Sequence, residues 1–278
     1  MKLVCRDRVV SLERVAIMGV LNVTPDSFSD GGLWLDAEAA VAHGVDMAGR
    51  GAAIIDVGGE STRPGAEPVP LEEELRRVLP VIRALASHTD AVISIDTRKP
   101  EVAQAALEVG AALVNDTAGE EADPAMDRVV AQAGAAVCVM HSRGTPATMR
   151  NLTSYADVVA DVGSFLARRI EELTAAGVER EAVTIDPGIG FAKAPEQNLE
   201  LLRRLDELVA IGPPVLIGTS RKSFIGHVLG TEVDERLEGS LATEVWAVIK
   251  GARIVRVHDV EQTVRAVRMI EAIVHGWT

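Results

Sequence analysis

Short apolar, β-branched runs alternate with longer amphipathic stretches along most of this chain. The alternation recurs eight times, which indicates repeated β-α units and a parallel sheet. The strands are expected at residues 15–20, 54–57, 92–95, 112–114, 136–140, 183–185, 215–217 and 254–257.

The clearest helix is predicted between the fifth and sixth strands, over residues 155–177. Its apolar residues recur at helical spacing on one side, which should pack on the sheet. The charged residues fall mostly on the opposite side: Arg168, Arg169, Glu171 and Glu172. Gly177 is expected at the end of this helix, and Gly51 and Gly110 are expected at the ends of two others.

No Pro/Ser-rich linker interrupts the eight repeats. We therefore expect an α/β fold in which the sheet closes into a (β/α)8 TIM barrel rather than staying open. The 278 residues suit one such barrel, so residues 1–278 are interpreted as a single domain. Residues 1–14 are expected to add an N-terminal β-hairpin that covers the bottom of the barrel.

Composition narrows the choice of partners. No apolar run reaches the ~18 residues of a membrane span, and the first ten residues do not resemble a secretory signal, so a cytoplasmic protein is expected. Cys5 and Cys138 suggest neither a disulfide framework nor a zinc site, and Cys138 is expected to be buried and reduced. A net charge of −13 argues against nucleic acid as a partner. Any anionic substrate must therefore be held by a local cluster of positive residues.

Polar residues gather just past the carboxyl ends of the predicted strands, where the active sites of barrels are built. They are Asn22, Asp56, Glu60, Asp96, Asn115, Asp116, His141, Asp186, Ser220, Arg221, Lys222, Arg256 and His258. Two loops at the same end, 21–36 and 58–70, are long enough to act as lids or binding elements. The other four histidines fall in or beside predicted helices and are interpreted as surface or packing residues: His43, His88, His227 and His275.

Three of the strand-end residues suit a flat heterocycle. Asp96, Asn115 and Asp186 supply carboxylate and carboxamide groups, which match a ring edge with several N–H donors, such as a 2-aminopyrimidinone. The alternative is that they cap helices or tie down turns, above all Asp186, which precedes Pro187 and Gly188.

A second group suits a phosphate or diphosphate with Mg²⁺. Asn22, Arg63, Arg256 and His258 combine one neutral oxygen ligand with donors to anionic oxygen. The alternatives are a solvated loop residue for Arg63, a turn former for Asn22 and a salt bridge across the barrel top for Arg256 and His258. Lys222 is placed to reach both halves of the ligand. Arg221 is equally suited to pairing with acidic residues of neighbouring loops.

Taken together, these segments resemble dihydropteroate synthases. The matching strings follow the order of that family and span nearly the whole chain: GVLNVTPDSFSDGG from Gly19, DVGGESTRPG from Asp56, SIDTRKP from Ser94, VND from Val114, MHSRG from Met140, IDPGIGFAK from Ile185, GTSRKS from Gly218 and RVHDV from Arg256. One such string is weak evidence, whereas eight at eight strand ends form a specific signal.

The resemblance implies a transferase of folate biosynthesis that joins 6-hydroxymethyl-7,8-dihydropterin diphosphate to p-aminobenzoate. Its pterin contacts would be Asp96, Asn115, Met140, Asp186, Phe191 and Lys222. Its diphosphate contacts would be Asn22, Arg63, Arg256 and His258, with Asn22 on Mg²⁺. Its p-aminobenzoate pocket would be Phe28, Thr62, Pro64, Lys222 and Ser223. The catalytic residues would be Asp96, Lys222, Arg256 and His258, and the reaction would be a dissociative substitution. Sulfonamides, which imitate p-aminobenzoate, should inhibit it.

Three residues depart from the family pattern and leave the fine shape of the pocket open: Thr117, Ile189 and Ala192. The sequence also leaves two alternative hypotheses about function. One is a methyltransferase barrel that handles methyltetrahydrofolate, which would have little use for the two long loops. The other is a catalytically silent pterin-binding homologue. The family further implies a homodimer, for which the last two helices offer apolar residues including Trp246, Ile249, Ile270 and Ile273.

Overall fold

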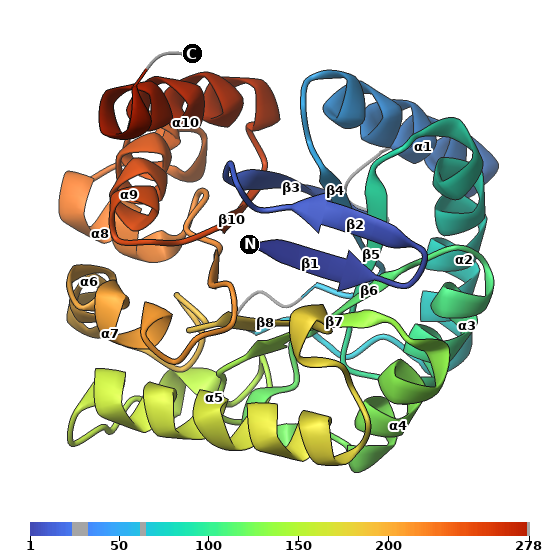
Figure 1. Cartoon of the computed structure of the whole chain (residues 1–278), viewed down its shortest axis with the longest axis horizontal. Coiled ribbons are helices and arrows are strands. Elements are labelled where there is room, and N and C mark those ends of the chain that lie inside the picture. Colours follow the sequence, from blue (N-terminus) through green and yellow to red (C-terminus); the bar gives the residue numbers. More distant parts are fainter. Residues whose placement is uncertain (24–32, 62–64, 277–278) are drawn as a thin grey trace.

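The computed structural model describes residues 1–23, 33–61 and 65–276, and its centre is a ring of eight parallel strands with helices outside (Figure 1). All eight predicted strands are present. The ring consists of β3 (Ala16–Asn22), β4 (Ile54–Gly58), β5 (Val92–Thr97), β6 (Leu113–Asp116), β7 (Ala136–Met140), β8 (Val183–Asp186), β9 (Leu216–Ile217) and β10 (Ile254–Val257).

The sheet closes on itself, as predicted. Its hydrogen-bonded order runs β8-β7-β6-β5-β4-β3-β10-β9, and a parallel bridge between Ile185 and Val215 joins the two ends. The Ile185 amide donates to the carbonyl of Pro214 at 3.0 Å across this seam. All six residues of β5 are buried, which is typical of a parallel sheet that is covered on both faces. The observed architecture is the predicted (β/α)8 barrel.

Helices connect the strands and form the outer layer (Figure 1). They are α1 (Leu33–Gly49), α2 (Leu71–His88), α3 (Pro100–Glu108), α4 (Pro124–Ala133), α5 (Val158–Ala175), α6 (Pro195–Arg203), α7 (Leu205–Val209), α8 (Ser223–Leu229), α9 (Leu237–Ile249) and α10 (Val260–His275). Among the described residues, no helix combines the length and the apolar character that crossing a bilayer requires.

Helix α5 lies where the sequence predicts it but is shorter at both ends. It begins after Asp157, whose side chain accepts hydrogen bonds from the amides of Val159 and Ala160 and so caps the first turn. The prediction for Arg169 was wrong. Its side chain is buried and forms two hydrogen bonds with Asp127 of α4, because the outer helices also pack against one another.

The N-terminal hairpin closes one end of the ring. Strands β1 (Lys2–Cys5) and β2 (Arg8–Ser11) pair antiparallel, and the Arg6 guanidinium donates to the carbonyls of Leu107 and Ala111, just before β6. The hairpin therefore covers the amino-terminal end of the strands, as predicted, and leaves the carboxyl end for a site (Figure 1). Both cysteines are buried and free.

Candidate active site

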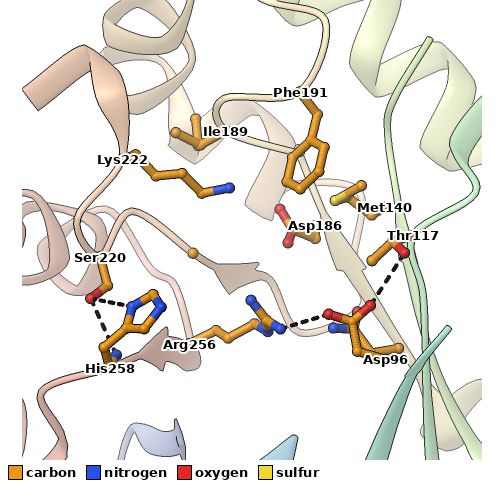
Figure 2. Close-up of a pocket in the computed structure, with 12 residues that line it drawn as sticks. Asp96, Thr117, Met140, Asp186, Ile189, Phe191, Ser220, Lys222, Arg256 and His258 are labelled. Atoms are coloured by element: carbon orange, nitrogen blue, oxygen red, sulfur yellow. Dashed lines mark hydrogen bonds and ion pairs between the residues drawn. The ribbon is translucent and has the colours of Figure 1, made fainter. Parts of the chain in front are cut away.

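A cavity lies at the carboxyl ends of the strands (Figure 2). It brings together predicted site residues that are separated by up to 162 positions in the chain, from Asp96 to His258. The lining residues are Asp96, Asn115, Thr117, Met140, Asp186, Ile189, Phe191, Gly218, Ser220, Lys222, Arg256 and His258.

The backbone holds the acidic part of the cavity rigidly. Strands β5 and β6 each end two residues later than the apolar pattern indicates, so Asp96 and Asn115 lie inside the strands and are neighbours in register. Side chains on paired strands are fixed by the ladder on both sides. The cavity therefore has a preformed wall of carboxylate and carboxamide groups.

Arg256 joins two carboxylates at the base of this wall. Its Nε donates to Asp56 Oδ2 at 2.6 Å, and its Nη2 donates to Asp96 Oδ2 at 2.7 Å. Burial nevertheless raises the pKa of Asp96 to about 7, against the opposing effect of Arg256. The salt bridge considered as an alternative for Arg256 is thus present, although the residue also lines the cavity.

Lys222 extends into the cavity from the loop after β9, and its Nζ lies 4.1 Å from the centre of the Phe191 ring (Figure 2). Its methylene groups also pack on Gly190, where an added Cβ would lie 3.1 Å from Lys222 Cδ. Burial, together with the nearby Arg256, lowers the pKa of Lys222 to about 8. The amine is therefore charged near neutral pH and loses its charge in mild alkali.

His258 lines the same cavity as a neutral ring. Burial lowers its pKa to about 4, and Arg256 acts in the same direction. Ser220 Oγ accepts a hydrogen bond from the His258 amide at 3.2 Å and lies 3.1 Å from Nδ1 (Figure 2). A hydroxyl can donate one hydrogen bond and accept two, so the contact with Ser220 fixes the orientation of the ring in either tautomer. In the tautomer in which Nδ1 accepts from Ser220, Nε2 carries the ring hydrogen and His258 is a hydrogen-bond donor.

The loop after β8 forms the roof of the cavity and carries Ile189 and Phe191. Asp186 Oδ1 accepts from the Gly188 amide at 2.7 Å, so Asp186 both ties down this turn and lines the cavity. Lys193 holds the loop from behind: its Nζ donates to the carbonyls of His141, Gly188 and Phe191 at 2.9–3.2 Å. The roof is therefore anchored at Gly188 and at the carbonyl of Phe191.

Comparison with known proteins decides the family. Residues 18–258 match the model of the pterin binding enzymes. Dihydropteroate synthase of Escherichia coli K12 is 46% identical over 272 residues, which cover 98% of this chain and 96% of the relative. The chain belongs to the dihydropteroate synthase family. As a member of this family, the chain is a transferase of folate biosynthesis, which contradicts the hypothesis of a methyltransferase barrel.

Solved dihydropteroate synthases share the whole fold. The Xanthomonas albilineans enzyme with 4-aminobenzoic acid superposes with a TM-score of 0.92 at 45% identity, covering 98% of this chain and 97% of that one. The Yersinia pestis enzyme, in complex with a sulfonamide drug, gives 0.93 at 42% identity, covering 99% and 100%.

Some residues that the dihydropteroate synthase pattern singles out are placed elsewhere. Ser223 is exposed at the start of α8 and does not line the cavity. Asn22 ends β3, half-buried and beside the cavity, with its Oδ1 close to Gly58. Four predicted residues lie outside the described part of the chain: Phe28, Thr62, Arg63 and Pro64.

Several other strand-end residues serve the scaffold. Arg221 forms two hydrogen bonds with Asp259, which is the pairing considered for it from sequence. His141 is buried against Phe165 and Tyr155 and does not line the cavity. Glu60 binds Lys99, and Asp116 accepts from the Ala118 amide.

Sequence reasoning gave no role to three residues that shape the site. Thr117 and Ile189 appear there only as departures from the family pattern, yet both line the cavity, and the Thr117 hydroxyl donates to Asp96 at 3.2 Å. Asp56 is completely buried beneath it. Its position at the end of a predicted strand was the only sequence signal for a role in the site, and its hydrogen-bond partners show what that role is.

Proposed function

We propose that this cavity performs the dihydropteroate synthase reaction, the joining of 6-hydroxymethyl-7,8-dihydropterin diphosphate to p-aminobenzoate with release of diphosphate. Asp96, Asn115 and Asp186 would accept hydrogen bonds from the pterin ring, while Met140 and Phe191 would cover its faces. Arg256 and His258, together with Arg63 and Asn22, would hold the diphosphate. Lys222 would contact the pterin and the p-aminobenzoate pocket, to which Phe28, Thr62, Pro64 and Ser223 would also contribute.

The observation that carries this proposal is the division of the cavity into two sides. Acceptor groups of Asp96 and Asp186 line one side, and the donors Lys222, Arg256 and His258 line the other (Figure 2). Asn115, the neighbour of Asp96 in register, adds a further acceptor to the cavity lining. A flat ring with N–H donors and an anionic leaving group needs both sides within one molecule's length. The sulfonamide complex of the Yersinia pestis relative supports the same pocket for mimics of p-aminobenzoate.

The residues suggest how the reaction proceeds. Electron donation from the pterin ring lets the diphosphate leave ahead of attack, so negative charge grows on the departing oxygen and positive charge spreads over the ring. Arg256 and the His258 N–H would stabilise the first, and the Asp96 carboxylate the second. The amine of p-aminobenzoate is nucleophilic when neutral, so Lys222 would act mainly by positioning.

We also propose that a magnesium ion binds at the cavity edge. A Cβ added at Gly58 would lie 3.8 Å from both Asn22 Oδ1 and Asp96 Oδ2, so these two oxygens lie near one point at the cavity edge. No group of three His, Cys, Asp or Glu suited to a metal occurs in the described parts of the chain. Mg²⁺ typically takes one or two protein oxygens and completes its shell with water and phosphate oxygens. When bound here, it would supply charge neutralisation for the diphosphate.

The direct test is product formation from pterin diphosphate and labelled p-aminobenzoate. We expect turnover with Mg²⁺, loss of at least about 100-fold on removing the metal with EDTA, and recovery when Mg²⁺ is added back. Sulfonamides should compete with p-aminobenzoate. Undiminished turnover without metal would contradict the magnesium proposal, and no turnover under any condition would indicate a silent homologue.

The pH dependence should report two groups of the cavity. Asp96 has a pKa of about 7 and loses its negative charge below it, and Lys222 has a pKa of about 8 and loses its positive charge above it. We expect kcat/KM of the free enzyme to fall on both sides of this interval. In Lys222→Arg the alkaline limb should move beyond pH 10, because guanidinium does not titrate there, while the acid limb stays. An unmoved alkaline limb would contradict this assignment.

We also propose a cytoplasmic homodimer that buries part of α9 and α10. These helices pack together and expose apolar side chains at helical spacing, including Trp246 at 43%, Ile249 at 52% and Ile273 at 66%. Light scattering should show a dimer that Ile273→Asp converts to a monomer. Val9→Asp, at a similarly exposed position of the hairpin, is the control and should leave the dimer intact.

A further inference from the structure

Asp56 is the most deeply buried acid of the site, and it does not line the cavity. It lies in β4 with no exposed surface, directly beneath the wall that Asp96 and Asn115 form. Its Oδ2 accepts two hydrogen bonds, from Arg256 Nε at 2.6 Å and from Asn115 Nδ2 at 3.0 Å. Both donors belong to residues that do line the cavity.

The bond to Asn115 decides which end of its amide faces a ligand. A carboxylate paired with a guanidinium can only accept, so it binds the amide NH₂ and repels the amide oxygen. One N–H of Asn115 Nδ2 is thereby bound to Asp56, which places the amide nitrogen on the side of Asp56. Its Oδ1 has no hydrogen-bond partner within the described chain and is left as an acceptor on a residue that lines the cavity.

We propose that Asp56 is a positioning residue that sets the ligand specificity of this wall by fixing the orientation of the Asn115 amide. Without this bond the amide is free to rotate by half a turn and present NH₂ to the ligand. The acceptor wall of Asp96, Asn115 and Asp186 would then contain a donor at its centre. A ring edge made of N–H donors would meet that donor and bind less well, because a buried donor facing another donor stays unsatisfied.

This inference rests on the proposed function, in which Asn115 contacts the pterin. A residue that only stabilises the fold would not be coupled to Asn115 in ligand binding. We expect Asp56 and Asn115, in contrast, to affect ligand binding as one unit. The loss caused by changing Asp56 should disappear once the Asn115 amide is gone.

The test is a double-mutant cycle on the dissociation constant of 6-hydroxymethyl-7,8-dihydropterin, measured by calorimetry. The ligand lacks the diphosphate, so effects through Arg256 on the leaving group do not enter. Asp56→Asn keeps the size of the side chain but lets either end of the new amide face Asn115. We expect about tenfold weaker binding, and less than a twofold further loss when Asp56→Asn is added to Asn115→Ala.

Ser94→Ala is the matched control. Ser94 pairs with Asp56 in register, is also completely buried, and its hydroxyl has no hydrogen-bond partner in the part of the chain described. The control should keep wild-type affinity within twofold. If Asp56→Asn unfolds, Asp56→Ser repeats the cycle with a smaller hydroxyl that also accepts or donates.

The outcomes separate the two proposals. Wild-type protein that fails to bind the pterin overturns the proposed function and, with it, the role of Asp56. Binding by the wild type, with equal losses from the Asp56 change in the presence and absence of the Asn115 amide, overturns the positioning role alone. An unchanged affinity in Asp56→Asn does the same.

Discussion

Lys222→Ala should lower kcat/KM by about 10³-fold, and Asp96→Ala should have an effect of similar size, with the folded state preserved in both. Each change removes one charged group from a cavity where burial strengthens electrostatic effects. Steady-state kinetics with both substrates would measure the loss. Near-native kcat in both variants would contradict the assignment of this cavity as the active site.

Stability should respond very differently from activity. The folded state lowers the pKa of Lys222 from 10.5 to about 8, so burying its charge costs free energy below pH 8. That cost fades as pH rises from 8 to the unfolded value. Lys222→Ala should therefore unfold at a Tm no lower than wild type at pH 7, and it should lack the part of the stability gain that wild type shows between pH 8 and 10.5. Lys2→Ala, in the exposed hairpin strand, is the control for both measurements.

Gly188→Ala should destabilise the protein by about 3 kcal/mol or more and distort the roof of the cavity. Gly188 has a φ of +69°, and a Cβ there would lie 1.9 Å from the carbonyl oxygen of His141, which is backbone and cannot turn aside. The turn must therefore shift, together with the carbonyls that hold Lys193 and the position of Phe191. Denaturant unfolding gives the loss of stability, and KM for the pterin substrate should rise with it.

Gly134→Ala separates the two causes of that loss. Gly134 has a similar φ of +60° at the end of α4, but an added Cβ there meets nothing within 4 Å. It should cost only about 1 kcal/mol, the usual penalty of the left-handed region, and leave KM unchanged. Equal losses in the two variants would show that the contact with His141 is relieved without moving the roof.

The strands and their order can be predicted from the local pattern of apolar and polar residues. Eight apolar runs, with polar residues at or just past their carboxyl ends, predict the barrel and place Asp96, Asn115, Asp186 and Arg256 at one end of it, because parallel strands end at a common edge. Strand ends were less certain. Asp96 and Asn115 belong to the strands themselves, since a polar side chain that points into a barrel mouth does not interrupt the backbone ladder.

The hydrogen-bond partners of these side chains could not be predicted from the sequence pattern. Arg256 bonds to Asp56 and Asp96, which lie 200 and 160 residues away, and Arg169 of a seemingly polar helix side is buried on Asp127. Charge spacing within one element carries no information about such distant contacts.

By itself, the sequence determined the barrel, the end at which its chemistry gathers and the family of the enzyme, because these depend on periodicity and on motifs that are local in the chain. Only the tertiary structure decided which side each polar residue faces. In strands that are buried on both sides, apolar residues do not alternate with polar ones, so no periodicity of two distinguishes the interior of the barrel from the helix layer. That is why Asp56 could be counted among the strand-end residues from sequence, while its bond to Asn115 required the assembled sheet.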